Sequence, residues 1–174
     1  MSLKSVPIVA VLVVILLVVG SSHAQQSNPL DVVPEKMPFD IAYGPPISLE
    51  RADAVIAAAL AEAKKHDWKL NCAVVDSGAN LVSFKRMDGA QLASIAIAEH
   101  KARTAAKFRR ETKVLENAIQ LTNFNYTLTF DDVIASRGGI PLVEDGKMIG
   151  AIGCSGGTGS QDEVAAKAGA ALIK

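Results

Sequence analysis

The chain begins with an unbroken apolar run over residues 8–19, preceded by Lys4 and followed by small residues up to Ala24. A positive start, a short apolar core and a small-residue end are typical of a cleaved secretory signal peptide, whereas a membrane-spanning helix needs about 20 apolar residues. We therefore predict a signal peptide over residues 1–24, with an uncleaved anchor as the alternative. The remaining chain, residues 25–174, is expected in the periplasm or outside the cell, with no stable membrane span.

Prolines interrupt any regular pattern in residues 25–47, which hold five of the seven prolines in the chain. Proline fixes φ and removes a backbone donor, so this segment is predicted to be an extended arm. Phe39, Ile41 and Tyr43 alternate along it, which favours a segment that docks over a floppy leader. A neighbouring subunit is one surface on which it could dock.

Apolar residues recur at helical spacing after Ser48, across residues 92–108 and after Ser160, and a further short helix is expected over residues 112–121. Ser48 can cap the first helix. Ser160 and a glutamate three residues later, Glu163, are predicted to form a capping box at the start of the last helix.

Strand-like patterns lie between these helices, over residues 69–75, 81–87, 140–144 and 147–154. Turn-forming residues join them into two hairpins, and Asp145-Gly146 is a two-residue hairpin signal. The order helix, hairpin, helix, hairpin, helix predicts an α+β fold, with an antiparallel sheet and helices packed on it.

The composition narrows the classes of function. Eighteen basic residues balance eighteen acidic ones, so the chain lacks the basic excess of a nucleic-acid-binding protein. A hydrophobic content of 49% excludes a disordered chain, and two cysteines are too few for a disulfide scaffold or a four-cysteine zinc site.

Three parts of the sequence form a recognisable combination. They are AVVDSGAN at residues 73–80 with MDGA at 87–90, IAEHKARTA at 97–105, and GGIPLVEDG at 138–146 with GAIGCSGG at 150–157 and QDE at 161–163. Together they resemble the GlcG/HbpS family, also called the haem-degrading domain family, which is related to the carboxy-terminal domain of PduO-type proteins. The resemblance covers residues 48–174.

This resemblance implies a profilin-like fold, in which helices flank an antiparallel sheet, and assembly into homo-oligomers. It also implies an exported haem- or tetrapyrrole-binding protein, linked to haem degradation or iron handling, with haem as the cofactor. Because aromatic residues make up only 5% of the chain, we expect a haem site to be shallow or shared between subunits.

His100 is the candidate iron ligand, since neutral imidazole is a common ligand of haem iron. Lys101 and Arg103 beside it could bind carboxylates, either the haem propionates or a small organic acid. The structural alternative is a solvated helix face on which Glu99 and Arg103 form an ion pair at i,i+4 spacing.

The glycine-rich stretch at residues 154–162 leads from a strand into the last helix. Gly156 and Gly157 could present backbone amides to an anion, or could simply allow a tight turn. If the protein is an enzyme acting on a small organic acid or metabolite, Asp88 and Glu99 are the candidate proton-transfer groups. A non-catalytic oligomeric envelope module is a further alternative, so the sequence leaves open whether the protein is an enzyme.

Cys72 and Cys154 fall on predicted strands that the profilin-like strand order places side by side. In an oxidising compartment they could form a disulfide. The alternative is a pair of buried thiols that act as small apolar side chains.

Overall fold

The computed structural model describes residue 28 and residues 31–174, so the predicted signal peptide lies outside the described residues. Residues 36–174 form one compact unit, and every element below belongs to it. Within the described residues, no helix combines the length and the apolar character needed to cross a bilayer.

The longest strand, β5 (Lys147–Ser155), organises the five-stranded sheet. It pairs antiparallel with β4 (Gly139–Glu144) and with β2 (Asn71–Asp76), and β2 pairs antiparallel with β3 (Leu81–Arg86). Both predicted hairpins are therefore present, as β2–β3 and β4–β5. The predicted α+β fold with an antiparallel core sheet is confirmed.

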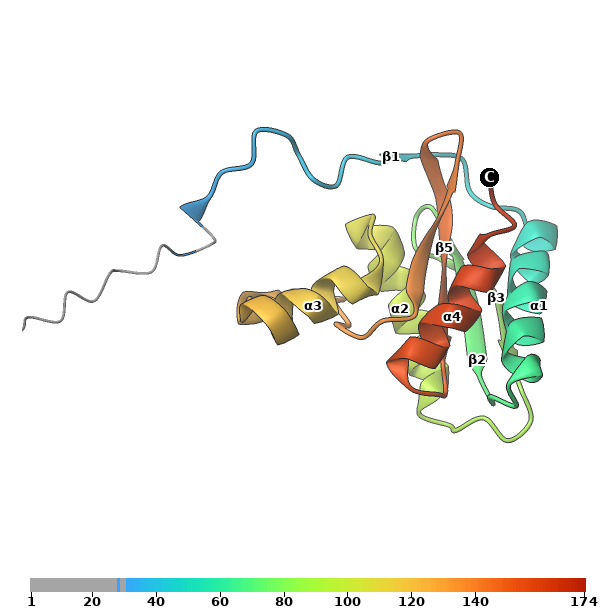
Figure 1. Cartoon of the computed structure of the whole chain (residues 1–174). Helices are drawn as coiled ribbons and strands as arrows, with labels where there is room; N and C mark the ends of the chain where they lie inside the picture. The colour runs from blue at the N-terminus through green and yellow to red at the C-terminus, as the bar shows by residue number, and fades with distance from the viewer. Residues whose placement is uncertain (1–27, 29–30) are drawn as a thin grey trace, which may run out of the picture. The chain divides into compact units, whose positions relative to one another are not determined.

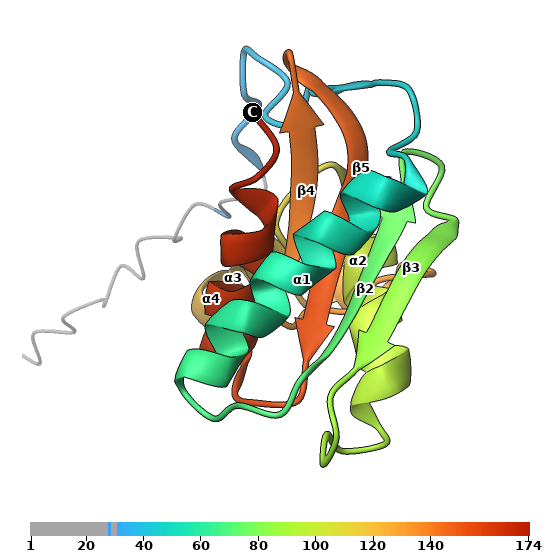
Figure 2. The same cartoon turned by 90° about the vertical axis from the view of Figure 1, so that its right-hand side faces the viewer.

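Helices cover both faces of this sheet (Figures 1 and 2). The first face is covered by α1 (Leu49–Lys65) and α4 (Gly159–Ala170), and the second by α2 (Ser94–Phe108). The shorter α3 (Thr112–Thr122) follows α2 and leads into the 3-10 turn η2 (Asn125–Thr129).

Alternating strand residues supply the two cores, because successive side chains point to opposite faces of a sheet. Val74 and Ile152 pack in the cluster that includes α1 and α4 residues, whereas Ala73, Val75 and Ala151 pack with the alanines of α2. Gly153 lets α2 approach the sheet closely, since a Cβ there would collide with the backbone of this helix. The alanine content of the chain is therefore used for close packing on this face.

The structure has the predicted hairpin turn at Asp145-Gly146, but its capping box on α4 is not the predicted one. Asp145 and Gly146 both have positive φ, as the predicted two-residue hairpin turn requires. The predicted capping box of Ser160 and Glu163 is wrong, because the N-cap of α4 lies two residues earlier. Thr158 is its N-cap, and the side chain of Gln161 completes the box. Sequence spacing alone fits both pairs, since each places a hydroxyl three residues before a Gln or Glu side chain.

The carboxy-terminal part of the Pro-rich segment packs against its own domain. The two-residue strand β1 (Ala42–Tyr43) pairs in parallel with the start of β5, and Ile47 is buried in the core. The Tyr43 hydroxyl donates a hydrogen bond to the carbonyl oxygen of Lys107, at 3.0 Å. Residues 36–47 thus belong to the compact unit, although the sequence predicts that the domain begins at residue 48.

Candidate functional site

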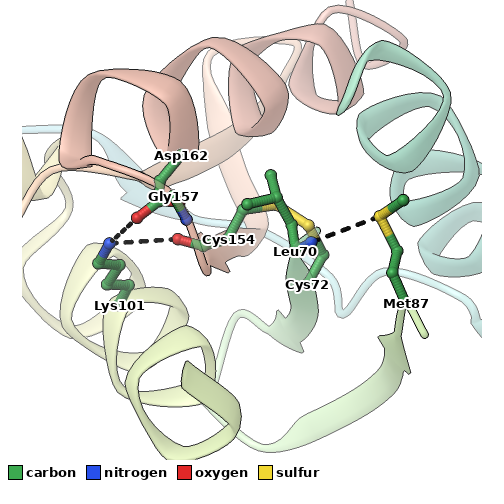
Figure 3. Close-up of a disulfide and its surroundings, with 7 residues drawn as sticks. All are labelled: Leu70, Cys72, Met87, Lys101, Cys154, Gly157 and Asp162. Atoms are coloured by element: carbon green, nitrogen blue, oxygen red, sulfur yellow. Dashed lines mark hydrogen bonds and ion pairs between the residues drawn. A yellow bond between two sulfur atoms is a disulfide. The ribbon is translucent and has the colours of Figure 1, made fainter. Parts of the chain in front are cut away.

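A buried ion pair connects α2 to α4 (Figure 3). Lys101 and Asp162 are only 1% and 2% exposed. The Lys101 Nζ donates to Asp162 Oδ2 at 2.8 Å and to the carbonyl oxygen of Cys154 at 3.3 Å. The predicted ligand-binding cation Lys101 thus has its ammonium inside the protein and already paired. Because the Lys101 ammonium is buried and paired with Asp162, a ligand carboxylate at the protein surface cannot reach it.

The same aspartate also fixes the glycine-rich bend. Asp162 Oδ1 accepts a hydrogen bond from the backbone amide of Gly157, at 3.0 Å, and Gln161 accepts one from the amide of Thr158, at 2.8 Å. Gly156 has a φ of +148°, and a side chain there would collide with the carbonyl oxygen of Lys69. The amide that Gly157 would offer to an anion is therefore already engaged, and Gly156 has a conformation and a close contact that require glycine, which favours the tight-turn interpretation.

A disulfide joins Cys72 to Cys154 directly beneath this bend (Figure 3). The two residues face each other in the register of β2 and β5, and both are fully buried. The sequence left a disulfide and two free thiols open, and the structure has the disulfide. Because the Cys154 carbonyl oxygen accepts from Lys101, the disulfide and the buried ion pair meet at one strand position.

His100 lies on α2 and is partly buried. Its Nε2 atom is buried and has no hydrogen-bond partner among the described residues. Glu99 and Arg103 form the predicted i,i+4 ion pair, at 2.9 Å, and Lys107 is paired with Asp132. The imidazole therefore lies on a helix that also carries two partly exposed cations, Arg103 and Lys107.

The charges around Asp132 show how these groups converge. A hydrogen bond from Lys107 lowers the pKa of Asp132 most, and the nearby charges of Lys107 and Arg103 lower it further. The segment after η2, which contains Asp132, is also held against α2, since the Thr104 hydroxyl donates a hydrogen bond to the Asp132 carbonyl oxygen at 2.9 Å. Asp132 thus joins Glu99 as an acidic partner of the α2 cations, and no local pattern in the sequence indicates this long-range contact.

The two candidate proton-transfer groups lie in different surroundings. Asp88 is exposed at a depression lined by α1 and β3 residues, whereas Glu99 pairs with Arg103 on α2. No hydrogen bond or ion pair within the described part of the chain joins them. Across the same residues, no group of three or more His, Cys, Asp or Glu side chains could hold a metal ion.

A charged network ties α3 to α4 and to the loop before β4. Glu163 pairs with Lys167 at 2.7 Å and with Lys113 at 3.2 Å, while Glu116 pairs with Arg137 at 2.7 Å. Burial alone would raise the pKa of Glu163, but hydrogen bonds from Lys167 and Lys113 outweigh it and hold the pKa below its usual range. The ionised form of Glu163 is therefore the one that the fold stabilises.

Because of this network, we expect the free energy of unfolding to decrease at acidic pH. A carboxyl whose pKa is lowered on folding adds stability above its unfolded pKa of about 4.3, and that stability is lost as the pH falls through the folded value. We expect Glu163→Gln to lower the free energy of unfolding at pH 7 by about 1–2 kcal/mol, with the difference from wild type shrinking towards pH 3. Urea unfolding at both pH values measures it, with the exposed Glu35 changed to Gln as the control. A difference that stays constant with pH would contradict this assignment.

Comparison with known proteins identifies the family. A family model described as "Haem degrading protein HbpS-like" matches residues 47–171. The chain belongs to this family. The HbpS-like match includes α2, the buried ion pair and both cysteines, and it confirms the resemblance seen in the sequence.

Individual HbpS-like relatives agree with this assignment. Protein GlcG of Escherichia coli (strain K12) is 42% identical over 109 residues, which cover 63% of this chain and 81% of GlcG. A double mutant of Streptomyces reticuli HbpS superposes with a TM-score of 0.70 at 27% identity, covering 84% of this chain and 99% of that one. A PduOC–haem complex superposes with a TM-score of 0.67 at 27% identity, covering 74% of this chain and 96% of that one.

Proposed function

We propose that this protein is an exported haem-binding member of the HbpS-like family, with His100 as the iron ligand. The observation that carries the proposal is the buried Nε2 of His100, which lacks a hydrogen-bond partner among the described residues. Buried polar atoms in proteins are nearly always hydrogen-bonded, so one that is not calls for an explanation such as an absent ligand. The family description and the PduOC–haem complex point to haem as that ligand.

The surrounding residues fit the charge of a haem group. Arg103 and Lys107 follow His100 by three and seven residues, which places all three on one side of α2. Their side chains are 36% and 43% exposed, so they can exchange Glu99 and Asp132 for the two propionates. We assign no propionate to Lys101, because its ammonium is buried against Asp162. When bound, haem would supply a redox-active iron.

The proposal also includes export from the cytoplasm and assembly into a homo-oligomer. A fully buried disulfide is typical of proteins that fold in oxidising compartments, which supports export to the periplasm or beyond the cell. We also propose a homo-oligomer, because α3, η2 and the residue after η2 each carry an exposed large apolar side chain: Leu121, Leu128 and Phe130. Since the Nε2 of His100 is covered within one chain, haem binding there requires the neighbouring side chains to move.

Haemin titration of the purified protein tests the proposed function. We expect a saturable shift of the Soret band, because ligation of the iron by imidazole changes its absorption. The shift is expected to saturate at one haem or less per chain, the lower ratio arising where subunits share a site. A Soret band that stays at the position of free haemin across the titration would overturn the proposal.

A further inference from the structure

A charged depression of about 420 Å³ lies on the α1 side of the protein. The carboxy-terminal part of α1 and the end of β3 form it, together with Lys69 before β2. His100 is on α2, which covers the opposite face of the sheet (Figure 1). The depression is therefore separate from the proposed haem site, and its volume is within the range of small-molecule pockets, about 300–1,000 Å³.

Four cationic side chains line the depression, from Lys64, Lys69, Lys85 and Arg86, against a single carboxylate, that of Asp88. Lys69 and Lys85 have acidic partners outside the lining, Asp67 and Asp53. By contrast, no hydrogen bond or ion pair is made by the side chains of Lys64 and Arg86 within residues 31–174. A bound anion could therefore pair with Lys64 and Arg86 without breaking an existing ion pair.

The depression also has an apolar part, formed by Leu60 and Met87. Met87 is fixed in place, because its backbone amide donates to the Leu70 carbonyl oxygen at 3.0 Å and its Sδ accepts from the Leu70 amide at 3.4 Å. Figure 3 shows the hydrogen bond from the Leu70 amide to the Met87 Sδ. A small apolar surface between cations matches an organic anion with a short carbon skeleton better than it matches an inorganic ion.

We propose that this depression binds a small organic polyanion of the di- or tricarboxylate class. Lys64 and Arg86 bind its carboxylates, and Leu60 and Met87 contact its carbon chain. Asp88 lies in the same lining and repels the ligand, which limits the affinity. The preference for ligands with more than one negative charge comes from the cations of the lining. This site goes beyond haem binding and does not depend on it.

Calorimetric titration with citrate and with succinate tests the site. We expect both to bind wild type at low salt, and the double variant Lys64→Ala/Arg86→Ala to bind them about tenfold more weakly. Asp88→Asn is expected to strengthen binding about two- to threefold, because it removes a like charge from the lining. Lys147→Ala changes an exposed lysine in the β4–β5 hairpin and serves as the control. It should leave the affinity unchanged.

The outcomes separate this site from the haem site. Absence of binding by both acids, or an equal loss in the Lys147→Ala control, would overturn the proposal. Saturating citrate should leave the haemin Soret titration unchanged, and the double variant should bind haemin as wild type does. Competition between citrate and haemin would show that the depression is not a separate site, whereas a failed haemin titration with intact citrate binding would overturn only the haem proposal.

Discussion

Replacing Lys101 with methionine is expected to lower the free energy of unfolding by about 3–5 kcal/mol. Methionine has a similar length, so the packing of α2 is largely kept. The Asp162 side chain, only 3% exposed, would be left inside the protein without its cation. The Gly157 amide would remain as its partner, and one neutral donor does not replace a buried opposite charge. Urea unfolding of the variant measures the loss.

Two further variants show whether the buried charge is the cause. Arg103→Met removes another cation from α2, but its ion pair with Glu99 is partly exposed and should contribute less than about 1 kcal/mol. Lys101→Met/Asp162→Leu removes both buried charges and should recover much of the stability lost in the single variant. A Lys101→Met loss no larger than that of Arg103→Met, or a double variant no more stable than Lys101→Met, would contradict the account.

The disulfide is expected to contribute about 4–5 kcal/mol to the free energy of unfolding. It closes a loop between two cysteines that are 82 residues apart, and a long loop restricts the unfolded chain strongly. Equilibrium unfolding with and without dithiothreitol measures the effect, because the reductant opens the disulfide in the unfolded state.

The double variant Cys72→Ala/Cys154→Ala provides the control for that measurement. It should be less stable than oxidised wild type by at least the same amount, since it also loses two buried sulfur atoms. The reductant should have no effect on it. A wild-type stability that is the same in oxidising and reducing buffer would show that the cysteines are not joined.

Much of the fold could be predicted from local patterns in the sequence. Strand-like segments and the turn residues between them, including Asp145-Gly146, predicted the hairpins, and helical spacing predicted the helices, because these signals depend on neighbouring residues only. The capping box was misplaced by two residues, since Thr158 and Ser160 are both followed at the right spacing by a suitable partner.

The position of Lys101 was not predictable from its own helix. Ala98, Ala102 and Ala105 surround it, and alanine fits both buried and exposed helix positions, so the pattern does not show which face is inside. Its partner Asp162 lies 61 residues away in the chain. The docking of β1 on β5 is also a long-range pairing, for which the Pro-rich segment gave only the weak signal of alternating Phe39, Ile41 and Tyr43.

The most direct test of the proposed haem site compares the Soret titrations of His100→Ala and His66→Ala. These are the two histidines within the described residues. His66 is 46% exposed and stacks on Trp68, at a centroid distance of 4.4 Å. We predict that His66→Ala shows the same haemin-induced Soret shift as wild type and that His100→Ala loses it. An unchanged shift in His100→Ala would contradict the assignment of His100 as the iron ligand.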